Sequence, residues 1–158
     1  MKLYKMEERG YLARITPSRD DMAHLVTAIQ RRLMDAGNPS VTKENRLQQA
    51  YQAVLQVAIA ALHAKGYRLK SKPAHHVMAI ESLEHTVGVD RRLRDYYQSL
   101  RKRRHHAIYD ALISVSKQDL EEAIDRAEGL FAAFRKWLEK EQPELVDDSI
   151  WQRPVDPG

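Results

Sequence analysis

The stretch from residue 41 to residue 65 constrains the fold more than any other, because its second half is apolar on nearly every side. That half reads AVLQVAIAALHA. A helix that is hydrophobic all round is buried among its neighbours, so we expect it to be the central helix of the domain. Its many alanines would let neighbouring helices approach closely. Gly66 follows and is predicted to end the helix, because glycine readily adopts the left-handed conformation found just past a helix end.

Four other segments repeat apolar residues at the spacing of amphipathic helices. They run over about 19–36, 74–87, 90–108 and 116–141. Ser18 and Ser116 are expected to cap the first and the last of them, each with an aspartate three residues later. No strand-period segment competes, and residues 67–73 are interpreted as a basic loop. Helices joined by short loops predict an all-α fold, an antiparallel bundle of about five helices.

Length and composition limit the class of protein. A chain of 158 residues suits one domain, with an N-terminal extension (1–17), the bundle (18–142) and a C-terminal tail (143–158) tethered by Trp151. The absence of cysteine excludes disulfides and thiolate metal sites. No secretory signal opens the sequence, and no apolar run approaches the roughly 20 residues of a membrane span. We therefore expect a cytoplasmic protein without a membrane partner.

The most informative helix covers the stretch 93–110, LRDYYQSLRKRRHHAIYD. At helical spacing its inward stripe carries an arginine among apolar residues, in the order Leu93, Tyr97, Leu100, Arg104 and Ala107 or Ile108. Burying an unpaired charge is very costly. Arg104 therefore needs either a carboxylate, such as that of Glu81, or a polar cleft that opens to solvent, and the two arrangements are compatible.

Positive charge is concentrated in the same helix. The formal net charge of +4 is modest, but a basic stripe of this density suits phosphate contacts with a nucleic acid or a nucleotide. The side chains predicted to contact nucleic acid are Arg94, Arg101, Lys102, Arg103 and Arg104. A solvated face, or one that pairs with an acidic partner protein, explains the charge equally well.

Four features follow one another in the order found in a known family of helical bundles. A long alanine-rich helix ends in the turn Gly66-Tyr67-Arg68, and a short helix opens with His75-His76. The LRKRRHHAIYD stretch comes next, and then a serine-capped helix with the pattern AxxRAExLFxxF. Over residues 19–138 this order resembles the HEPN superfamily, named for higher eukaryotes and prokaryotes nucleotide-binding domains.

The resemblance implies a small helical bundle that dimerises. Many HEPN proteins are metal-independent endoribonucleases with an Arg-x(4–6)-His motif, which both protomers contribute to a dimer cleft. Some are toxins paired with a minimal nucleotidyltransferase antitoxin, and others bind without catalysis. Here Arg101 and His106 match the motif spacing literally. Alternatively, Arg104 aligns with the arginine of an RNxADY-like motif, beside His105, and Tyr109 takes the place of the catalytic histidine.

These matches imply an RNA-binding protein, with metal-independent endoribonuclease activity in a toxin–antitoxin or phage-defence system as the expected function. The expected catalytic residues are Arg101, Arg104, His105, His106 and Tyr109. Histidine titrates near neutral pH and can move a proton, and arginine offers a planar fork to phosphate. The expected partners are RNA, a second copy of the chain, and a cognate antitoxin or nucleotidyltransferase. No cofactor and no metal are expected.

A second function of a different class stays open. The chain can instead be a non-catalytic dimeric module that binds a protein partner or a nucleotide. The positions of the His105 and His106 side chains distinguish the nuclease from the binding module. If either shares a cleft with Arg104, the nuclease has its geometry; if both point away to solvent, the binding module is favoured.

The pair His75-His76 suggests a metal ligand set. Adjacent histidines on a helix point about 100° apart, however, and rarely chelate one ion together. We therefore expect His76 to be a hydrogen-bonded core residue and His75 to lie at a helix start.

Overall fold

The structure is a computed structural model that describes residues 1–109 and 114–152, with the backbone alone at residues 108 and 109. The elements lie in the order α1 (Leu3–Glu8), β1 (Leu12–Arg14), α2 (Arg19–Ala36), α3 (Lys43–Ala64), β2 (Tyr67–Leu69), α4 (His75–Ser82), α5 (Arg91–Tyr109) and α6 (Lys117–Glu141). Two short 3-10 helices follow, at Pro143–Leu145 and Asp148–Trp151. The predicted all-α helical bundle is confirmed, and each helix expected after residue 18 is present.

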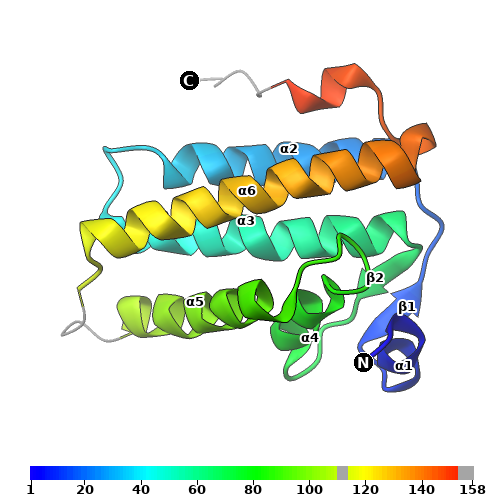
Figure 1. Ribbon diagram of the computed structural model, residues 1–158, viewed down its shortest axis with the longest axis horizontal. Coiled ribbons are helices and arrows are strands. Elements are labelled where there is room, and N and C mark those ends of the chain that lie inside the picture. The colour runs from blue at the N-terminus through cyan, green and yellow to red at the C-terminus, as the bar shows by residue number, and fades with distance from the viewer. Residues whose placement is uncertain (110–113, 153–158) are drawn as a thin grey trace.

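α3 is the central helix, as predicted. It contacts α2, α4, α5, α6 and β2, and Figure 1 shows it running between α6 and α5. Its second half is buried on all sides through Ala53, Val54, Leu55, Val57, Ala58, Ala60, Ala61 and Leu62. Thr42 caps its start, where the hydroxyl accepts a hydrogen bond from the Asn45 amide at 3.3 Å. Gly66, with a φ of +88°, follows its end, as predicted.

The predicted serine caps begin α2 and α6. Ser18 Oγ accepts a hydrogen bond from the Asp21 amide at 3.1 Å, and Ser116 Oγ accepts one from the Asp119 amide at 3.0 Å. Each bond satisfies an amide that the first helical turn leaves without an intrahelical partner. Both helices then pack their apolar faces against α3.

α4 is shorter than predicted, because it ends at Ser82 and not near residue 87. Ser82 Oγ donates to the Ala79 carbonyl at 2.6 Å, and such side-chain bonds to nearby backbone compete with helical bonding. Gly88, with a φ of +84°, closes the turn, and its amide donates to the Leu83 carbonyl at 2.9 Å. Apolar spacing alone therefore placed this boundary too late.

A small two-stranded sheet occupies part of the segment 67–73, for which the sequence predicts a basic loop. β1 pairs antiparallel with β2, with Leu12 opposite Leu69 and Arg14 opposite Tyr67. The interpretation as a loop is wrong for β2, because its pairing partner lies far away in the sequence and leaves no local signal. Beside the sheet lies a second small core, made of Leu3, Met6, Leu12, Leu62 and Tyr67.

α5 turns two neighbouring stripes toward different parts of the fold. The stripe through Tyr97 and Leu100 is fully buried in the core that α3 organises. The stripe through Arg94, Gln98 and Arg101 carries polar side chains, the first two of which bond to α4. Successive helical residues point about 100° apart, so one helix can serve both surfaces.

The C-terminal segment packs on the bundle through Trp151, as predicted. Its ring centroid lies 5.9 Å from that of Phe131 and 6.5 Å from that of Phe134. Among the helices that the structure describes, none is long and apolar enough to cross a bilayer.

Candidate functional site

A cationic cavity of about 540 Å³ lies between the start of α4 and the second half of α5. It is lined by Ser71, Lys72, Pro73, Ala74, His75, His76, Val77, Arg101, Arg104 and His105. Among these described lining residues there is no carboxylate. The cavity is therefore a concave surface of one charge sign, which concentrates anions.

Two elements supply its basic side chains. On α5, Arg104 and His105 lie three and four residues after Arg101, so each is a neighbour of Arg101 on the helix surface. On the other side the chain turns sharply before α4 at Ala74, which has a φ of +67°. A non-glycine residue in this left-handed region costs about 1 kcal/mol, and such strain is concentrated at functional sites. The turn brings His75 and His76 to the cavity at the start of α4.

Tyr51 of α3 contacts both sides of the cavity from the hydrophobic core. Its ring is fully buried. Its hydroxyl oxygen lies 3.2 Å from His76 Nδ1, and the guanidinium carbon of Arg104 lies 4.8 Å from the centre of its ring. One rigid core side chain therefore supports a histidine from α4 and an arginine from α5.

Burial and the neighbouring charges shift the pKa values of Tyr51 and His76. Burial raises the pKa of Tyr51, although the positive charges of Arg104 and Arg101 partly offset the rise. Burial also lowers the pKa of His76 below its ordinary value, and positive charge on His75, Arg104 and Arg101 lowers it further. At neutral pH the Tyr51 hydroxyl is therefore protonated and His76 is uncharged.

His75 and Lys72 are anchored at the rim. His75 Nδ1 lies 2.7 Å from the Lys72 carbonyl oxygen, and its ring centroid lies 4.3 Å from that of His76. The Lys72 ammonium donates to the Arg9 carbonyl and lies 4.3 Å above the ring of Tyr11. The N-terminal segment thus holds one of the cavity's cations.

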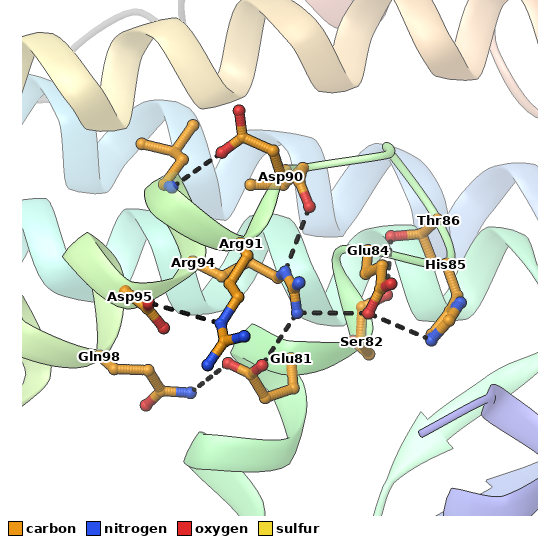
Figure 2. Close-up of polar contacts among 12 residues, drawn as sticks. Glu81, Ser82, Glu84, His85, Thr86, Asp90, Arg91, Arg94, Asp95 and Gln98 are labelled. Atoms are coloured by element: carbon orange, nitrogen blue, oxygen red, sulfur yellow. Dashed lines mark hydrogen bonds and ion pairs between the residues drawn. The ribbon is translucent and has the colours of Figure 1, made fainter.

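Arg101 is oriented by a polar chain along α5 and α4. Arg101 Nε donates to Gln98 Oε1 at 3.2 Å, and Gln98 Nε2 donates to Glu81 Oε2 at 2.9 Å and to the Val77 carbonyl at 3.1 Å. The other Glu81 oxygen accepts from Arg94 at 2.9 Å. Figure 2 shows Glu81 between Arg94 and Gln98.

The structure corrects the prediction for Arg94. This residue is 8% exposed and lies close to both Glu81, at 2.9 Å, and Glu84, at 3.3 Å, and its Nε also donates to the Val89 carbonyl. A buried, neutralised guanidinium is not available to a nucleic-acid phosphate. Arg94 therefore holds α5 on α4, and it lies outside the cavity.

The pairing considered for Arg104 with Glu81 is not formed, because Arg94 occupies that carboxylate. Arg104 instead has the second arrangement, a polar cleft, since it lines the cavity. Its Nε is buried and has no hydrogen-bond partner within the described part of the chain. That atom is shielded from solvent, so the contact that Arg104 can offer an anion in the cavity comes from the other nitrogens of its partly exposed side chain.

Of the two candidate histidines, His105 lines the cavity with Arg101 and Arg104, whereas His106 does not. His106 lines a different cavity with Leu47, Arg103, Ala107, Ser114, Val115 and Asp119. The literal spacing of Arg101 and His106 therefore does not place the two side chains together. The Tyr109 side chain lies outside the described residues.

The remaining predicted nucleic-acid contacts lie outside the cavity. Lys102 is exposed, and Arg103 lies 3.8 Å from Asp119 and 5.8 Å from the ring centre of Tyr96. Lys72 and Tyr51 belong to the site although nothing in the sequence pattern indicates them, and the sequence predicts no catalytic role for His75 or His76. Adjacent histidines at a helix start were the signal available, but the proximity of that start to α5 is a tertiary fact.

No metal site emerges from the described residues, because no group of three or more histidine, aspartate or glutamate side chains is arranged to hold an ion. His76 is half-buried and hydrogen-bonded, and His75 is the first residue of α4.

Comparison with protein-family models, curated proteins and solved structures finds no significant match to this chain. The chemistry of the cavity is therefore the basis for a function.

Proposed function

We propose that this chain is a HEPN-like RNA-binding protein whose cationic cavity holds a phosphodiester and cleaves it without a metal ion. The observation that carries the proposal is the lining of that cavity. Arg101, Arg104 and His105 from α5 share it with the basic residues before and at the start of α4, and no carboxylate is among its described lining residues. An anionic phosphate backbone, and not a cationic or neutral ligand, matches such a surface.

The residue types suit the chemistry of RNA cleavage. An arginine fork binds two phosphate oxygens at once and stabilises the extra negative charge of the phosphorane-like transition state. A histidine can move a proton to or from the 2′-hydroxyl or the leaving oxygen. Arg104 is the residue we assign to the phosphate, because it lines the cavity and the ring of Tyr51 supports its guanidinium. His105 is assigned to proton transfer, since it shares the cavity.

The resemblance extends the proposal to the protein's partners. A second copy of the chain would double the positive field if the two cavities faced one another. A nucleotidyltransferase-type antitoxin and a role in defence within the cytoplasm are also proposed, on the strength of the resemblance and not of the cavity.

The test is cleavage of single-stranded RNA by the purified protein in the presence of EDTA. Wild type is compared with Arg104→Gln and His105→Gln, and His106→Gln is the matched control one residue away. We expect metal-independent cutting that falls by about 10²-fold or more in the first two variants. The control is expected to stay within a few-fold of wild type, because His106 lines another cavity.

Two results would contradict the proposal, the first its site and the second its activity. Equal losses in His105→Gln and His106→Gln would show that the cavity is not the reaction site. A folded wild type that binds RNA but leaves it intact would favour the non-catalytic binding module. The same preparation, run on a sizing column with light scattering, reports whether the chain is a dimer.

A further inference from the structure

Two adjacent histidines in the cavity have hydrogen bonds that distinguish their ring nitrogens. His75 Nδ1 lies 2.7 Å from the Lys72 carbonyl oxygen. A carbonyl oxygen can only accept a hydrogen bond, so His75 must carry a proton on Nδ1. In the neutral ring, Nε2 is then the nitrogen with the free lone pair.

The hydrogen bond of His76 runs in the opposite direction, because its Nδ1 accepts where that of His75 donates. Its Nδ1 lies 3.2 Å from the hydroxyl oxygen of Tyr51, which is fully buried. A buried hydroxyl needs an acceptor for its proton, and His76 Nδ1 is the acceptor within reach. Tyr51 therefore donates to Nδ1, and the proton of the neutral His76 ring resides on Nε2.

We infer that the fold holds His75 and His76 in opposite tautomers, so that His75 Nε2 is a proton acceptor and His76 Nε2–H is a fixed donor to the phosphate. The inference rests on the proposed function and adds to it two residues that lie outside α5. The two ring centroids are 4.3 Å apart and both residues line the cavity. A single phosphodiester can therefore contact both.

The assignment divides the work of cleavage among named atoms. His75 Nε2 takes the proton of the 2′-hydroxyl, and the freed 2′-oxygen uses its electron pair to form a bond to phosphorus. The bond from phosphorus to the 5′-oxygen breaks, and its electron pair stays on that oxygen. The leaving oxygen takes a proton from the histidinium form of His105. His76 Nε2–H and Arg104 bind the non-bridging oxygens throughout.

Tyr51 acts in this arrangement as a positioning residue, because it is buried beneath the cavity and does not reach the substrate. Its hydroxyl sets the tautomer of His76, and its ring supports the Arg104 guanidinium at 4.8 Å. Tyr51→Phe removes the hydroxyl but keeps the ring. The Arg104 guanidinium also lies close to that hydroxyl and partly offsets the rise that burial causes in the pKa of Tyr51, so the variant removes a contact to each residue, and the ring-nitrogen spectra isolate the effect on His76.

The first test reads the tautomers directly, without RNA. Long-range proton–nitrogen spectra of protein labelled with 15N-histidine show which ring nitrogen carries the proton, and His75→Gln and His76→Gln assign the signals. We expect Nδ1–H for His75 and Nε2–H for His76 in wild type. In Tyr51→Phe the His76 pattern should change while that of His75 stays. Tyr97→Phe, which removes a buried hydroxyl bonded to the Arg126 carbonyl, is the control.

The second test uses cleavage kinetics. We expect His75→Gln to lower kcat by about 10²-fold or more with KM little changed, as for the loss of a general base. Tyr51→Phe should instead raise KM by roughly three- to tenfold, because the phosphate loses an oriented donor. His24→Gln, an exposed histidine of α2, should match wild type in both constants. Circular dichroism melting verifies that each variant is folded.

The outcomes separate this inference from the proposed function. The same tautomer for both histidines, or a Tyr51→Phe protein with unchanged His76 signals, would overturn the inference even if RNA is cut. A wild type that cuts no RNA would overturn the proposed function and with it the role of His75 as a base. Titration with inorganic phosphate would then test whether His76 donates to phosphate. A shifted His76 Nε2–H signal supports that role, and an unmoved signal contradicts it.

Discussion

Arg94 and Glu81 form the ion pair that joins α5 to α4, with Arg94 Nη1 at 2.9 Å from Glu81 Oε1 (Figure 2). The second oxygen of Glu81 accepts from Gln98, and Gln98 in turn accepts from Arg101 at the cavity. The pair therefore stabilises the fold and also orients a side chain of the candidate site.

Replacing Arg94 by methionine is expected to lower the free energy of unfolding by about 2 kcal/mol. Removing one partner of a buried pair costs about 3–5 kcal/mol, but Glu81 and Glu84 are partly exposed and water can solvate them. Urea denaturation measures the change. Arg91→Met is the matched control, because Arg91 and Asp95 form an exposed pair at 3.9 Å, and its effect should stay within about 0.5 kcal/mol. Equal effects would contradict a structural role for Arg94.

Gln98→Leu should weaken binding of a non-cleavable RNA by roughly three- to tenfold, the loss expected when a group is no longer held in its binding orientation. The reason is that Arg101 loses the oxygen that fixes its Nε. Fluorescence anisotropy with a 2′-O-methyl oligonucleotide measures the affinity. Gln118→Leu, at an exposed position of α6, is the control. An unchanged affinity would show that Arg101 needs no support from Gln98.

The salt dependence of RNA binding should report the phosphate contact of Arg104. Each cation that neutralises a phosphate of a single strand contributes about 0.7 to the slope of log affinity against log salt concentration. Arg104→Gln should therefore reduce the slope by about 0.7. Arg91→Gln, an exposed arginine in the first turn of α5, should leave the slope unchanged. If both variants change it equally, the positive charge acts diffusely and the cavity is not the binding site.

The lowered pKa of His76 predicts a stability that declines in mild acid. The folded-state pKa lies below the ordinary 6.5, so between these two values the unfolded chain binds a proton that the folded chain does not. The free energy of unfolding therefore falls as the pH drops below about 6.5. His76→Gln should flatten this part of the stability profile, measured by urea denaturation at several pH values. His24→Gln, at an exposed position, should leave the profile as steep as in wild type.

Much of the helical framework could be predicted, because its signals are local. The apolar spacing of α2, α3 and α6, the serines that cap α2 and α6, and the glycine after α3 all act within a few residues of one another. The end of α4 was missed, because the hydrogen bond from the Ser82 side chain to the backbone there leaves no trace in the apolar spacing. The pairing of β1 with β2 was missed because the two strands are distant in the sequence.

The candidate site could be predicted in part. The helical stripe pointed to Arg104 as the inward arginine of α5, and Arg104 does line the cavity, but Arg101 and Arg103 are buried to a similar extent and Arg94 more deeply. It could not show that Arg94 would take the Glu81 carboxylate, or that His105 and not His106 would share a cavity with Arg104. These pairings depend on how α5 is rotated against α4 and α3, which is a property of the docked helices.

The sequence by itself determined where the helices form and that a dense positive charge lies on one of them, because periodicity, capping and composition are properties of neighbouring residues. The tertiary structure alone decided which charges are neutralised and which remain available. Packing buried Arg94 between two glutamates, and it placed Tyr51 of the central helix beneath both His76 and Arg104. Such contacts join residues far apart in the chain, so they exist only once the helices have docked.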